Sequence, residues 1–160
     1  MQIYLLRHGI AEDHAASGRD SDRALTADGR KKLREVLDAA RRAGLEPDLI
    51  LTSPYRRAIE TAEIAAEALR YSGELIKIDE LAPEADPHAL WEELRAQRGI
   101  GQILVASHEP LMSRSAAFLL DSPSLAIDFK KAGILRIDMD RPSAAPRGVL
   151  KWFLTPKLAG

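Results

Sequence analysis

Short runs rich in apolar residues alternate with amphipathic stretches along most of the chain, and this alternation restricts the possible folds more than any other feature. Four runs have the length of strands, at residues 3–6, 48–53, 74–78 and 102–107. Between the first two runs, apolar residues recur at the spacing of one helix face: Leu33, Val36, Leu37 and Ala40. Strands that alternate with helices are typical of α/β folds with a parallel sheet.

Capping residues and prolines indicate where the helices begin and end. Thr26 is suited to cap the first helix, and Gly44 follows its last apolar residue. Pro54 and Pro110 are expected to open two further helices, and another helix is expected near residues 87–98. In the tail, "GILRIDM" and "GVLKWFL" are separated by "DRPSAAPRG", a pattern that predicts a hairpin at a sheet edge. We therefore expect a three-layer α/β/α sandwich with a mostly parallel central sheet and an antiparallel C-terminal edge hairpin.

Length and composition narrow the classes of protein to which the chain can belong. At 160 residues the chain is expected to form a single domain, residues 1–160. Zero cysteines exclude disulfides, thiolate catalysis and cysteine-ligated metals, and a net charge of −1 gives no basic field for nucleic acid. No apolar run approaches the length of a membrane span. We expect a cytoplasmic monomer that binds neither nucleic acid nor membrane.

Charged and nucleophilic side chains follow three of the expected strands. The first strand runs into Arg7-His8-Gly9, the second leads to Arg57 through "SPYRR", and the fourth ends at His108. The carboxyl ends of parallel strands meet at one edge of a sheet, so these side chains can share one pocket. Guanidinium groups match the oxygens of a phosphoryl group. The sequence therefore predicts a phosphate-binding site at this edge.

The segments "LLRHG", "SPYRRAIETA" and "LVASHEP" resemble, in order and spacing, the three signatures of the histidine phosphatase superfamily, also called the phosphoglycerate mutase-like proteins. The resemblance implies that His8 attacks phosphorus and carries the phosphoryl group, and that Arg7, Arg57 and His108 complete the catalytic pocket. It implies neither a metal nor another cofactor. Residues consistent with this chemistry surround the histidine. Arg7 and Arg57 should disfavour the imidazolium, and backbone groups beside Gly9 can fix the tautomer of His8.

Two further residues are candidates for substrate binding. Arg23 lies in "SDRALTADG", which resembles a segment of one branch of the superfamily. Arg23 is expected either to contact a substrate phosphate or to stabilise the start of the helix that follows. Many members carry a catalytic glutamate after the third strand, but here Pro83 occupies that position and Glu84 follows one residue later. Ser53 and Thr61 are expected to support the pocket rather than to react.

The pattern around Pro83 is similar to that of the SixA-type phosphohistidine phosphatases, although Ile10 stands where that group often has an acidic residue. An alkoxide leaving group needs a general acid, whereas imidazole leaves more easily. The expected function is therefore hydrolysis of phosphohistidine on a protein. The alternatives are a small-molecule phosphomonoesterase, with a phosphate ester as substrate and Glu84 as acid, and a non-catalytic phosphate-binding module.

Overall fold

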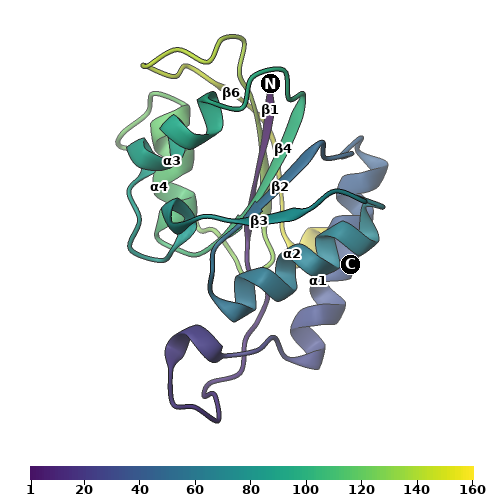
Figure 1. Ribbon diagram of the computed structural model, residues 1–160. Helices are drawn as coiled ribbons and strands as arrows, with labels where there is room; N and C mark the ends of the chain where they lie inside the picture. The colour runs from purple at the N-terminus through teal and green to yellow at the C-terminus, as the bar shows by residue number, and fades with distance from the viewer.

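A six-stranded sheet in the order β3-β2-β4-β1-β5-β6 forms the centre of the molecule (Figure 1). The computed structural model describes all residues, 1–160. The neighbours β1–β4, β4–β2 and β2–β3 are parallel, and β1–β5 and β5–β6 are antiparallel. The strands are β1 (Gln2–Arg7), β2 (Leu49–Thr52), β3 (Leu75–Lys77), β4 (Gln102–Ser107), β5 (Ile134–Asp138) and β6 (Val149–Leu154). The predicted fold class and the C-terminal edge hairpin are confirmed.

Helices cover both faces of the sheet, as Figure 1 shows. One face carries α1 (Ala27–Arg42), α2 (Arg56–Ala68) and the short α5 (Pro156–Ala159), and the other carries α3 (Pro87–Arg95) and α4 (Leu111–Leu119). Two 3₁₀ turns, η1 (Asp20–Asp22) and η2 (Asp79–Leu81), lie in the connections. None of the helices has the length and hydropathy needed to cross a membrane.

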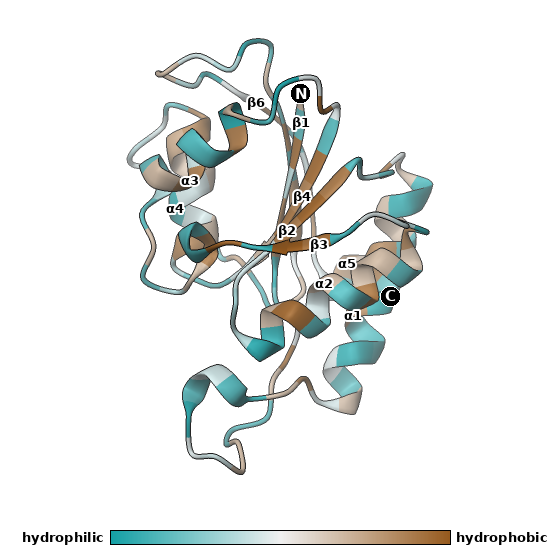
Figure 2. Ribbon diagram, in the orientation of Figure 1, coloured by the Kyte–Doolittle hydropathy of each residue, from teal (hydrophilic) through white to brown (hydrophobic).

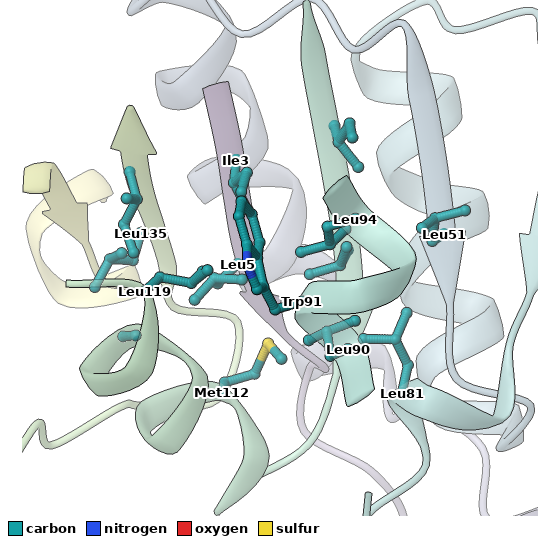
Figure 3. Close-up of a cluster of buried hydrophobic side chains, with 14 of the residues drawn as sticks. Ile3, Leu5, Leu51, Leu81, Leu90, Trp91, Leu94, Met112, Leu119 and Leu135 are labelled. Atoms are coloured by element: carbon teal, nitrogen blue, oxygen red, sulfur yellow. The ribbon is translucent and has the colours of Figure 1, made fainter. Parts of the chain in front are cut away.

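Successive residues of β1 pack into two separate cores, which explains its unbroken apolar run. Ile3 and Leu5 belong to the core under α3 and α4, which also contains Trp91 (Figure 3). Tyr4 and Leu6 belong to the core under α1 and α2. Because side chains alternate along a strand, a strand covered on both faces must be apolar at every position. Figure 2 shows this hydrophobic character along the central strands.

Two helices begin later than the sequence predicts. The helix expected at Pro54 begins at Arg56, because Tyr55 has an extended backbone (φ −74°, ψ 139°) and is the N-cap. The Ser53 hydroxyl accepts the N–H of Tyr55 at 3.2 Å and so closes a turn before the helix. The helix expected at Pro110 begins at Leu111, with Pro110 itself as the N-cap. The prolines thus precede the first helical turn in both cases.

The strand order brings the ends of distant segments together. Arg7 at the end of β1 pairs with Ser107 at the end of β4, and Thr52 at the end of β2 pairs with Ala106. Because β5 is antiparallel to β1, its first residue, Ile134, lies opposite Leu6. The segment that precedes β5 therefore reaches the same edge of the sheet as the polar residues that follow β1, β2 and β4.

Candidate active site

Arg7, His8, Arg57 and His108 meet at the carboxyl edge of the parallel strands, as the sequence predicts. The Nε of Arg57, from the first turn of α2, lies 3.3 Å from the Nε2 of His8. The ring centroids of His8 and His108 are 5.1 Å apart. These side chains are buried, with 6%, 5% and 2% of the surface of His8, Arg57 and His108 exposed. Four residues from three separate elements thus form one cluster.

Two hydrogen bonds define the tautomer of His8. Its Nδ1 lies 2.7 Å from the carbonyl oxygen of Gly9, which can only accept, so Nδ1 carries the proton. The Nε2 atom then holds the lone pair and accepts from Arg57. Thr61 fixes this arrangement, because its hydroxyl accepts the N–H of Gly9 at 3.2 Å and donates to the carbonyl of Arg57 at 2.7 Å. The unprotonated nitrogen of His8 therefore faces a guanidinium group.

Burial keeps both histidines neutral. It lowers the pKa of His8 to about 4; the Gly9 carbonyl opposes this shift, and the positive charges of Arg57, Arg7 and Lys131 add to it. Burial is also the largest cause that lowers the pKa of His108 to about 3, followed by the neighbouring His8 and Arg57. The neutral imidazole expected from the arginines alone is thus due mainly to desolvation, to which the arginines add.

A short hydrogen bond with Ser53 orients His108, a contact that no local pattern in the sequence predicts. The Ser53 Oγ lies 2.7 Å from His108 Nε2 and is completely buried. Since this oxygen already accepts the N–H of Tyr55, its own proton is free to be donated to Nε2. With Ser53 as the donor, the proton of His108 is on Nδ1, which is buried and has no partner in the protein. The edge of the Tyr55 ring packs on His108, with centroids 5.2 Å apart.

Asp20 contacts Arg57 at the site, although it was not among the residues predicted there. The Arg57 Nη1 donates to the backbone carbonyl of Asp20 at 3.0 Å, and Nη2 donates to its carboxylate at 3.2 Å. Partial burial raises the pKa of the Asp20 carboxyl, but hydrogen bonds from Arg23 and Arg57 more than offset this, so the pKa lies below its ordinary value. Asp20 is therefore an ionised carboxylate that occupies the donors of Arg57. Its place beside "SDRALT" was the only signal in the sequence.

The two less specific candidates lie outside this cluster. Arg23 donates to the carboxylate of Asp20 at 2.8 Å and to the carbonyl of Glu12 at 3.0 Å, so it supports the η1 segment one contact away from Arg57. Glu84 is exposed between η2 and α3 and forms neither a hydrogen bond nor an ion pair with the four clustered residues. Arg7 donates to the carbonyl of Phe129 at 2.7 Å, while its buried Nε has no partner.

No group of three or more His, Cys, Asp or Glu side chains is arranged to hold a metal ion. The groups at the site are instead two neutral imidazoles and two guanidinium groups. Such groups can bind the oxygens of a phosphoryl group and offer one imidazole nitrogen to its phosphorus. The arrangement is thus suited to transfer of a phosphoryl group through an imidazole.

Three comparisons with known proteins agree with this geometry. The family profile of the histidine phosphatase superfamily (branch 1) matches residues 3–86. An uncharacterized protein of Picosynechococcus sp. is 33% identical over 138 residues, covering 84% of this chain and 83% of that protein. Phosphohistidine phosphatase SixA of Escherichia coli is 29% identical over 158 residues, covering 98% and 94%. The structure of the protein histidine phosphatase SixA with tungstate superposes with a TM-score of 0.89 at 29% identity, covering 98% of each chain.

Proposed function

Because this chain belongs to the histidine phosphatase superfamily and is a SixA-like phosphatase, we propose that it hydrolyses phosphohistidine on a protein substrate. The observation that carries the proposal is the buried pair of His8 Nε2 and Arg57 Nε, 3.3 Å apart, beside the ionised carboxylate of Asp20. The site supplies a nucleophile and cations for the phosphoryl oxygens. The carboxylate that contacts Arg57, that of Asp20, is ionised and so does not supply a proton to an alkoxide.

The reaction proceeds in two displacements at phosphorus. The lone pair on His8 Nε2 attacks, a new N–P bond forms, and the N–P bond of the substrate breaks. The substrate imidazole leaves as a neutral ring when its other nitrogen is protonated, so it needs no acid. Water then attacks the phosphoryl group on His8, loses a proton to solvent, and releases phosphate with His8 restored.

Three residues stabilise the phosphoryl oxygens in both displacements. Arg7 and Arg57 place cationic N–H groups around them, and the protonated Nδ1 of His108 is the unused donor of that ring. SixA, the solved relative, binds tungstate, a tetrahedral oxyanion, which supports an oxyanion site of this kind. No step uses a metal ion, so we propose a metal-independent enzyme.

The position of the carboxylates favours phosphohistidine over phosphate esters. Pro83 occupies the family's acid position, Glu84 is exposed and makes no contact with the cluster, and Asp20 is held ionised by Arg23 and Arg57. General acid catalysis contributes roughly 10²–10⁴-fold, so ester hydrolysis is expected to be slower by about that factor.

The test compares kcat/KM for a phosphohistidine peptide and for a sugar phosphate, in the wild type, Glu84→Gln and Glu46→Gln. Glu46 is an exposed control that precedes β2, at the opposite end of the sheet. We expect the peptide to be the better substrate and neither variant to change that order. Faster hydrolysis of the sugar phosphate, lost in Glu84→Gln alone, would establish a small-molecule phosphomonoesterase. Binding of phosphate without turnover of either compound would establish a binding module.

A further inference from the structure

A cleft with a cavity volume of about 790 Å³ lies beside the candidate active site and is rich in cations. Its walls come from α1, from the segment that precedes β5, and from the residues around the start of α5. It contains two carboxylates, Glu35 and Asp128, and five cations: Arg7, Lys32, Lys130, Lys131 and Lys157. This excess of positive charge stands out in a chain whose net charge is −1.

One wall of the cleft is hydrogen-bonded to the backbone of the nucleophile. The N–H of Ala132 donates to the carbonyl of His8 at 3.0 Å, and the N–H of Arg7 donates to the carbonyl of Gly133 at 3.0 Å. Ala132 has a left-handed backbone (φ 62°), so the chain turns sharply here before it enters β5. Lys131, one residue away, lies close enough to contribute to the lowered pKa of His8. Of the four clustered residues, Arg7 also lines the cleft, so the cleft and the candidate active site adjoin at this residue.

Two of the lysines have no internal partner for their charge. Lys130 pairs with Asp128 at 2.9 Å, and Lys32 pairs with Asp28 at 3.1 Å. Lys131 and Lys157 are exposed and form no ion pair. Like charges gathered on one surface repel each other, so they do not stabilise the fold. Their placement is explained by a negatively charged occupant.

The lining indicates what kind of anion fits. Seven of the twelve residues that line the cleft are charged, and Ile10 and Ala132 are its hydrophobic residues. No aromatic side chain lines the cleft, so there is no platform on which nucleic-acid bases could stack. Flexible lysines around an open cleft are suited to carboxylates on an extended polypeptide.

We propose that this cleft binds an acidic segment that flanks the phosphohistidine in the protein substrate. The inference rests on the proposed function, since it names the kind of phosphoprotein that the enzyme selects. Recognition of this kind is electrostatic, so it lowers KM and weakens as salt screens the charges.

The experiment uses two peptides that differ only beside the phosphohistidine. One carries four glutamates after it and the other carries four glutamines. The ratio of their kcat/KM values is measured for the full-length wild type, for Lys131→Gln/Lys157→Gln, and for Lys31→Gln/Lys151→Gln. The last variant loses the same charge from exposed lysines that do not line the cleft. A ratio is used because a reduced fraction of folded enzyme affects both substrates equally.

We expect the wild type to prefer the acidic peptide at low salt, by roughly three- to tenfold, which is the size of two exposed charge pairs. The preference should disappear in Lys131→Gln/Lys157→Gln, persist in the control variant, and decline as the ionic strength rises. If both peptides react equally well in the wild type, the cleft inference is wrong while the proposed function stands. If neither reacts but a sugar phosphate does, both are wrong.

Other outcomes would assign the cleft to a different occupant. A preference for the acidic peptide that survives in Lys131→Gln/Lys157→Gln would place its recognition elsewhere. Stronger inhibition by single-stranded DNA than by polyglutamate would assign the cleft to nucleic acid. A preference for a sugar bisphosphate over a monophosphate that needs the two lysines, without any preference between the peptides, would assign it to a small polyanion.

Discussion

Replacing Asp20 by asparagine is predicted to strengthen the binding of phosphate-like anions. In the unliganded site, Arg57 donates two of its N–H groups to Asp20, one at 3.0 Å to the carbonyl and one at 3.2 Å to the carboxylate. A phosphoryl group that binds Arg57 through Nη2 must displace that carboxylate. The Asp20 side chain is 61% exposed, so it can move away, but its charge competes for the same guanidinium group.

The size of the effect follows from two contributions. An exposed ion pair is worth about 0.2–1 kcal/mol, which asparagine removes from the unliganded state. Coulomb's law gives about 1 kcal/mol for two unit charges 4 Å apart in water, and about twice that for a dianion, which the carboxylate no longer repels. Screening by salt reduces both contributions. We therefore expect Asp20→Asn to tighten binding by about tenfold, or about 1.4 kcal/mol.

The assay is competitive inhibition by vanadate and by inorganic phosphate at several ionic strengths. Asp22→Asn is the matched control, because Asp22 belongs to the same 3₁₀ turn but pairs with Arg19 at 2.9 Å instead of Arg57. Its inhibition constants should equal those of the wild type. Unchanged or weaker inhibition in Asp20→Asn would refute the competition and show that Asp20 holds Arg57 in its productive position. A loss of ester hydrolysis alone would indicate that Asp20 acts as an acid.

The remaining predictions concern the nucleophile, the metal requirement, the second histidine and acid stability. His8→Ala should lose at least roughly 10³-fold in kcat and form no phosphoenzyme. Rapid quench of the wild type with labelled substrate should trap an acid-labile, base-stable phosphoenzyme. Near-normal turnover in the variant would show that His8 is not the nucleophile. Activity should withstand a chelator and be inhibited by vanadate, and its loss in chelator with recovery in Mg²⁺ or Zn²⁺ would contradict the metal-independent proposal. Ser53→Ala should lower kcat/KM by roughly tenfold and shift the acid limb of the pH–rate profile, because His108 loses the hydroxyl that sets its tautomer; a change in melting temperature with an unaltered profile would mean that Ser53 only packs. Burial lowers the pKa of His8 from 6.5 to about 4, so the unfolded chain binds more protons between these values, and the free energy of unfolding should fall as the pH drops, by about 2 kcal/mol per buried histidine between neutral pH and pH 5. Urea unfolding measures this, and a stability that stays level over that interval would contradict it.

The layered fold could be predicted because its causes are local. A strand buried on both faces must be apolar at every position, and an amphipathic helix repeats its apolar residues every three to four positions. Both patterns can be recognised in short segments of the sequence: the strand pattern at residues 3–6 and the helix pattern at residues 33–40. The first residue of α2 could not be predicted in this way. The Ser53 side chain closes a β-turn-like loop before the helix, so α2 begins at Arg56.

The positions of the four clustered residues were also predictable, since each lies at or beyond the carboxyl end of a parallel strand and such strands end at one edge. The tautomer of His8 was anticipated in part, because the carbonyl that fixes it belongs to the next residue, Gly9. A nucleophilic imidazole near two arginines could also be predicted before the fold was known, because this chemistry depends on the types of residue.

Tertiary structure alone decided which charges meet. Asp20 and Arg57 are 37 residues apart, and Ser53 and His108 are 55 apart. No local period links such pairs, because their distance depends on the order of the strands and the path of the loops. The same holds for the lysine cleft, which joins α1 to segments near the C-terminus. Burial, the largest cause of the lowered histidine pKa values, is likewise a property of the whole packed molecule and of no short segment.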